Sequence, residues 1–63
     1  MPFKVGQVYE RIDNPTRWAI VMQARNNGRE GLLNYFYSGE EEWVLWGEFE
    51  KSGEWRLQGG QEG

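Results

Sequence analysis

The chain contains no cysteine and no histidine. Without cysteine it can form neither a disulfide nor a thiolate metal site. Without histidine it lacks the commonest metal ligand and the side chain that most often serves as a general base near neutral pH. A catalytic base would have to be a carboxylate or a lysine with a shifted pKa, and a domain of 63 residues rarely encloses the pocket that such a shift needs. We therefore expect a protein that is not an enzyme and that uses no metal and no cofactor.

Long apolar segments are also missing. No run approaches the roughly 20 apolar residues that cross a membrane, and Met1 to Lys4 are not followed by the apolar segment of a signal peptide. We therefore expect no membrane association and a cytoplasmic location. The formal net charge is −3, and most of the carboxylates lie in the second half of the chain. This balance argues against duplex DNA as a partner, because DNA-binding domains are usually basic.

Aromatic side chains are abundant, with four Trp, three Tyr and three Phe in 63 residues. A chain this short buries only about 60% of the surface that its unfolded state exposes, so most domains of this size need an additional source of stability. Dense aromatic packing and oligomerisation are the sources that remain here, because aromatic side chains dominate the energetics of cores and interfaces.

Short apolar segments alternate with turn-forming residues along the chain. The strongest local signal is Asn26-Asn27-Gly28, since Asn-Gly suits the two positive-φ positions of a type I′ hairpin. Residues 47–51 are compatible with a strand or with one helical turn. The predicted strands are 7–12, 17–25, 31–38, 42–46 and 54–58. This pattern predicts one all-β domain over residues 5–58, a five-stranded antiparallel SH3-like (Tudor-like) small barrel or bent meander, followed by a flexible tail at 59–63.

The third and fourth predicted strands are apolar at both odd and even positions. Side chains of a strand alternate between its two faces, and a small barrel needs only one apolar face for its core. We assign the core to Val8, Ile12, Trp18, Ile20, Met22, Phe36, Leu45, Phe49 and Leu57. The other face then carries a surplus of Tyr9, Val21, Leu33, Tyr35, Tyr37, Val44 and Trp46. A bulge near Gly31 or Gly47 is the alternative, because it would bring both sets partly into one core.

A surplus aromatic face that no helix covers predicts an interaction surface. We expect it to meet a second copy, another protein or a flat ligand, with a homodimer favoured among the oligomers. Two arginines flank the predicted hairpin tip and could hold a phosphate or carboxylate, although a solubilising tip is the simpler interpretation. The predicted ligand-binding or partner-binding residues are Tyr9, Tyr35, Tyr37, Trp46, Arg25 and Arg29.

Three segments share a layout with a known group of proteins: Val5-Gly6-Gln7-Val8-Tyr9, Arg17-Trp18 followed by Ile20-Val21, and Phe49 followed by Trp55-Arg56-Leu57. Over residues 5–58 the chain resembles short uncharacterised bacterial and bacteriophage proteins with an SH3-like barrel, a resemblance that implies no catalytic residues. We expect a non-enzymatic binding module, such as a phage or bacterial accessory or inhibitory protein that sequesters a nucleotide-like ligand as an oligomer. The alternatives are a protein-interaction subunit that docks on a larger host or phage complex, and a single-stranded nucleic-acid binder.

Overall fold

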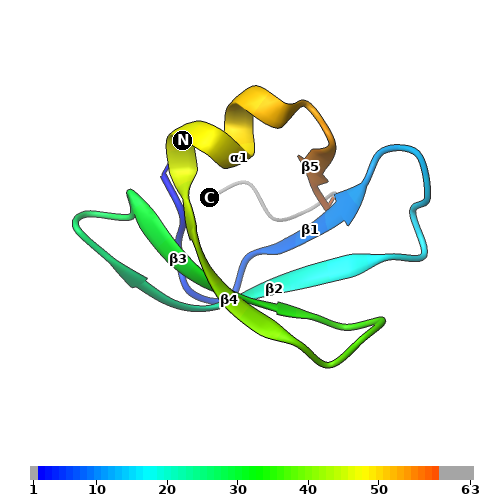
Figure 1. Cartoon of the computed structure of the whole chain (residues 1–63), viewed down its shortest axis with the longest axis horizontal. Coiled ribbons are helices and arrows are strands. Elements are labelled where there is room, and N and C mark those ends of the chain that lie inside the picture. The colour runs from blue at the N-terminus through cyan, green and yellow to red at the C-terminus, as the bar shows by residue number, and fades with distance from the viewer. Residues whose placement is uncertain (1, 59–63) are drawn as a thin grey trace.

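A computed structural model describes residues 2–58 of the chain (Figure 1). Its elements are β1 (Val8–Arg11), β2 (Trp18–Arg25), β3 (Glu30–Tyr35), β4 (Glu41–Leu45), α1 (Trp46–Ser52) and β5 (Trp55–Leu57). The strands form one antiparallel sheet in the order β4-β3-β2-β1-β5. The prediction of a small all-β fold is confirmed, and the segment that began at residue 47 takes its helical alternative. The tail predicted at 59–63 lies outside the described residues.

The β2–β3 connection is longer than a two-residue hairpin turn. Arg25 pairs with Glu30 across the end of the ladder, so residues 26–29 form the loop. Asn26, Asn27 and Gly28 all have positive φ, at 55°, 59° and 88°. Asparagine and glycine tolerate this region better than other residues, so the sequence located the turn correctly but not its length.

A β-bulge interrupts the pairing of β2 with β3. Val21 lies opposite Leu33 and Gln23 lies opposite Leu32, which leaves Met22 as the extra residue. The register shift considered near Gly31 therefore lies on the strand opposite that glycine. It does not bring both apolar sets into one core, since Met22 is exposed.

The core lies on the side of the sheet that faces α1, which we call the inner face (Figure 1). Phe49 points into the core from α1, and Phe3 enters it from the N-terminal segment. The backbone N–H of Phe3 donates to the Gly28 carbonyl (2.8 Å). The buried core residues are Phe3, Tyr9, Ala19, Val21, Leu33 and Phe49, with Ala24, Tyr35, Val44, Trp46, Trp55 and Leu57 packed against them.

The predicted division of the two faces is wrong. Of the nine residues assigned to the core, only Phe49 is buried; Val8, Ile20 and Leu57 are partly exposed, and the exposed ones are Ile12, Trp18, Met22, Phe36 and Leu45. The predicted surplus supplies most of the real core: Tyr9, Val21 and Leu33 are buried, Tyr35, Val44 and Trp46 pack against them, and Tyr37 alone is exposed.

The space available on the inner face explains the reversal. Phe3 and Phe49 fill that side of the sheet, so the strands need small residues beneath them. Ala19 is fully buried there, and a Cβ added to Gly31 would lie 2.7 Å from Phe3 Cδ2. The larger side chains of β2, such as Trp18, are directed to the other face.

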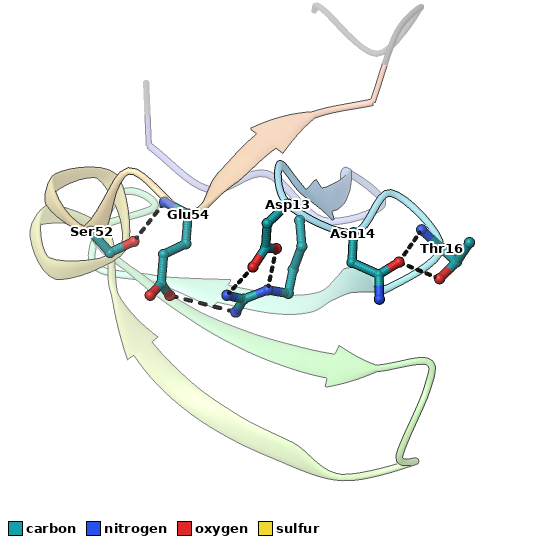
Figure 2. A network of polar contacts seen from close by, with 6 residues as sticks. Asp13, Asn14, Thr16, Ser52 and Glu54 are labelled. Carbon is teal, nitrogen blue, oxygen red and sulfur yellow. Dashed lines mark hydrogen bonds and ion pairs between the residues drawn. The ribbon is translucent and has the colours of Figure 1, made fainter.

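Polar contacts join the turn after β1 to the segment before β5 (Figure 2). The Arg11 guanidinium lies 3.1 Å from Asp13 Oδ1 and 3.6 Å from Glu54 Oε1, and it covers the Trp55 ring at 5.4 Å. The Glu54 N–H donates to Ser52 Oγ (3.3 Å). The hydrogen bond from Arg11 lowers the pKa of Asp13. Exposed pairs of this kind add little stability singly, but here they cover one edge of the core.

Candidate interaction surface

The side of the sheet turned away from α1 carries large apolar side chains. We call it the outer face and define it by residues that are 37–59% exposed: Trp18, Met22, Phe36, Trp43 and Leu45. The only helix among residues 2–58 packs on the inner face, so no helix in that range covers the outer one (Figure 1). An exposed apolar area of a few hundred Å² is typical of an interaction site.

Strand pairing makes the outer face continuous. The rings of Trp18 and Phe36 lie 5.7 Å apart at one end. Leu32 lies directly opposite Trp43 near the other end. Between these groups, the half-exposed Ile20 of β2 lies on the same side of the sheet. The same row holds Asn34 on β3 and Glu41 on β4, so the two apolar groups are linked through β2.

Four of the charged side chains on the outer face form ion pairs with one another. Arg25 Nε lies 2.7 Å from Glu30 Oε1, and the same guanidinium lies 3.9 Å from the centroid of the Trp43 ring. Arg56 Nε lies 2.7 Å from Glu10 Oε2. Glu41 lies on the same side of the sheet and accepts from the Asn34 amide (3.1 Å) without an ion pair among the described residues. The face therefore keeps one carboxylate and no unpaired arginine of these two, which does not suit a row of phosphates.

Two of the three predicted tyrosines lie together, since the rings of Tyr35 and Tyr37 are 6.0 Å apart, whereas Tyr9 lies in the core. Tyr9 is buried, its hydroxyl donates to Gln7 Oε1 (3.2 Å), and burial raises its pKa. The Tyr35 hydroxyl donates to Glu42 Oε2 (2.6 Å); burial, and then this bond, raise its pKa. Tyr37 is exposed and stacks under the Arg17 guanidinium at 4.8 Å. Two of the three therefore serve the core and its edge.

The remaining predicted site residues, Trp46, Arg25 and Arg29, do not form one cluster. Trp46 begins α1 and packs against the core, where its ring lies 6.5 Å from that of Tyr9. Arg25 stacks on Trp43 of the outer face rather than on a predicted tyrosine. Arg29 is exposed in the loop, and its carbonyl accepts the Trp46 N–H (2.7 Å). Tyr9 and Trp46 therefore lie together in the core, with the Arg29 backbone beside Trp46, whereas the Arg25 side chain lies on the outer face.

Two of the outer-face aromatic residues, Trp18 and Phe36, were missed because they were assigned to the core, and Trp43 was assigned to neither face. One signal could have found them. Ala19 and Gly31 leave room only if a bulky group from elsewhere packs on their side of the sheet. That reasoning places the small residues inside and turns Trp18 and Trp43 outward.

Comparisons with protein-family models, with curated proteins and with solved structures find no match for this chain. The resemblance to short bacterial and bacteriophage proteins with an SH3-like barrel therefore stays a prediction. Among residues 2–58, the structure has no helix long and apolar enough to cross a membrane. The interaction surface is therefore interpreted from its own geometry.

Proposed function

We propose that this protein is a non-enzymatic protein-binding module that acts through its outer face, and that it self-associates through this face. The observation that carries the proposal is the exposure of Trp18, Phe36 and Trp43 together on one side of the sheet. Monomeric proteins rarely leave such a group of aromatic rings in water unless it serves an interaction. Aromatic residues are also enriched in the centres of protein interfaces.

The energy available from burying this face is large for a chain of this size. A Trp or Phe side chain offers about 200 Å², so the exposed fractions of Trp18, Phe36 and Trp43 leave about 270 Å² of ring surface in water. At about 25 cal/mol per Å², full burial would contribute about 7 kcal/mol per chain. This is comparable to the roughly 3–9 kcal/mol by which a domain of this length is stable.

The charge pattern favours a second copy of the chain over nucleic acid. Binding to single strands combines aromatic stacking with a positively charged groove, yet Arg25 and Arg56 on this face are both paired with carboxylates. Two identical apolar faces can pack together about a two-fold axis, provided that Glu41 at the edge strand β4 stays in water. Docking on a larger host or phage complex would use the same face. A bacteriophage origin and a cytoplasmic location stay predictions.

Two adjacent residues on opposite sides of the chain provide the test. Phe36 and Tyr37 are both exposed, but only Phe36 contributes to the outer face. In sedimentation equilibrium from micromolar to millimolar concentration, we expect the mass to rise from 7.4 kDa towards twice that value. Phe36→Lys should weaken this association at least about 100-fold, because it buries an unpaired charge. The matched variant, Tyr37→Lys, should leave it unchanged.

Two results would refute self-association through this face. One is a wild-type protein that stays monomeric throughout the concentration range. The other is an equal loss of association in Phe36→Lys and Tyr37→Lys, because that would point to a general effect of the added charge. Circular dichroism on both variants should confirm that each is folded before the masses are compared. A salt-sensitive shift of single-stranded oligonucleotides by the wild-type protein would favour the nucleic-acid alternative instead.

A further inference from the structure

A pocket separate from the outer face opens between α1, β5 and the N-terminal segment. Its volume is about 600 Å³, within the range of roughly 300–1,000 Å³ found for small-molecule sites. No residue that defines the outer face lines it. Most of its lining is aromatic or aliphatic: Phe3, Tyr9, Trp46, Phe49, Trp55 and Leu57.

The aromatic rings of this pocket are arranged to receive a flat group. Phe49 stacks with Trp55 at a centroid distance of 5.8 Å and an interplanar angle of 18°. Trp46 lies 6.0 Å from Phe49 at 31°. Phe49 is buried between them, whereas Trp46 and Trp55 keep part of their surface exposed. Nearly parallel rings with accessible area favour a planar ligand, because ring pairs gain energy beyond area burial.

Gln7 gives the pocket a specific polar group. This residue is buried, and its side-chain oxygen accepts from the Lys4 backbone N–H (2.8 Å) and from the Tyr9 hydroxyl (3.2 Å). These two bonds fix which end of the amide is oxygen. Within residues 2–58 no acceptor bonds to the amide nitrogen, and Gln7 is one of the residues that line the pocket. The amide nitrogen is therefore a positioned donor that a ligand can use.

The rim of the pocket adds positive charge. Lys4 and Arg56 both lie on it, with Glu50 as the one carboxylate among the described lining residues. Arg56 is already paired with Glu10, whereas Lys4 forms no ion pair within residues 2–58. Lys4 is thus the cation best able to meet an anionic group on a ligand.

We propose that this pocket binds a planar aromatic ring that carries a hydrogen-bond acceptor on its edge and an attached anionic group. The ring packs against the exposed part of Trp46, the acceptor meets the Gln7 amide nitrogen, and the anion lies at Lys4. Nucleoside monophosphates and indole carboxylates share this chemistry. The site does not depend on self-association, because none of the five residues that define the outer face lines it; Arg56 alone lies at both.

Intrinsic fluorescence tests the proposal when the outer-face tryptophans are silenced. In a protein carrying Trp18→Phe and Trp43→Phe, emission comes from the two tryptophans of the pocket. We would titrate AMP, adenosine and indole-3-acetate separately, following indole-3-acetate by ligand-observed NMR because it fluoresces itself. We expect saturable binding of AMP or of indole-3-acetate, and the probe that binds identifies the source of the ligand.

Single substitutions in the pocket then test each contact. Lys4→Gln should weaken binding of the anionic probe about tenfold, while Lys51→Gln, a matched loss of charge outside the pocket, should not. Gln7→Glu keeps both accepted hydrogen bonds but removes the donor, so it should weaken adenosine as well as AMP. The proposal is overturned if no probe binds the folded protein at millimolar concentration. It is also overturned if affinity is unchanged in both Lys4→Gln and Gln7→Glu. Sedimentation of these variants reports the outer face separately.

Discussion

Replacing Gly31 by alanine adds one carbon at the place where the N-terminal segment crosses β3. The new Cβ would lie 2.7 Å from Phe3 Cδ2 and 2.8 Å from Phe3 Cγ, whereas carbon atoms normally approach to about 3.5–4.0 Å. The ring therefore has to move by about 1 Å. It is 2% exposed and lies edge-on against Trp46 and Phe49, at 5.0 and 5.1 Å, so it cannot move without disturbing them.

The expected cost follows from these contacts. Overpacking of a well-filled core costs about 1–3 kcal/mol, and complete loss of a buried Phe side chain costs about 3–5 kcal/mol. We expect Gly31→Ala to lower the free energy of unfolding by about 1–3 kcal/mol. In a Phe3→Ala background most of this cost should disappear, because only the Cβ of residue 3 stays close, at 3.2 Å, and alanine in a strand is more favourable than glycine by up to about 1 kcal/mol.

Urea denaturation followed by tryptophan fluorescence measures both effects in a double-mutant cycle. The variants are Gly31→Ala, Phe3→Ala and the double variant. Gly47→Ala is the control, because a Cβ there meets nothing within 4 Å. We expect the double variant to be no less stable than Phe3→Ala alone. If Gly31→Ala lowers the free energy of unfolding no more than Gly47→Ala does, Phe3 does not pack on β3. The division of the two faces, which depends on that packing, would then be refuted as well.

Three further predictions concern the edge of the core and the turns. The pKa of Tyr35 is raised above 10.0 by burial and by its bond to Glu42, so the stability that the neutral Tyr35 side chain adds is present below pH 10 and is lost as the pH rises above it. The urea midpoint should therefore fall less between pH 8 and 11 in Tyr35→Phe than in the wild type. An equal fall in both proteins would contradict the assignment. Gly28→Ala should lower the free energy of unfolding, measured by urea denaturation, by more than about 1 kcal/mol. The reason is that φ at Gly28 is +88° and the added Cβ would lie 2.6 Å from the Phe3 carbonyl oxygen. An unchanged stability would mean that the turn has another conformation. The hydrogen bond from Arg11 lowers the pKa of Asp13 from 3.8, so the stability that ionised Asp13 adds is present above pH 3.8 and is lost as the pH falls below that value. The difference in Tm between the wild type and Asp13→Asn should therefore vanish by about pH 2. A difference that persists at that pH would exclude an ionic origin.

The strands and turns of this protein could be predicted from its sequence because their signals are local. Asn26, Asn27 and Gly28 mark a turn by their tolerance of positive φ, and alternating apolar segments mark the strands on either side. The helical alternative for the segment after residue 46 also followed from local composition, with one aromatic residue, Phe49, facing inward.

The assignment of faces could not be made in the same way, because it depends on distant parts of the chain. Both phases of β3 and β4 are apolar, so alternation alone does not choose between them. The choice is made by Phe3, which lies outside every strand, and by the extra residue Met22, which shifts the alternation within β2. The predicted site residues were wrong for the same reason, since Trp18 and Phe36 of the outer face had been placed in the core.

The pairing of β5 with β1 also determines when the protein can fold. Glu10 and Arg56 bond across a separation of 46 residues, and contacts between such distant positions slow folding because a long loop must be closed first. A nascent chain that ends before residue 55 has no β5, so β1 leaves the ribosome early and keeps one edge open until the last strand follows. We therefore expect the sheet to be completed only after β5 has been synthesised. The pairing of β5 with β1 is then the late step that completes it.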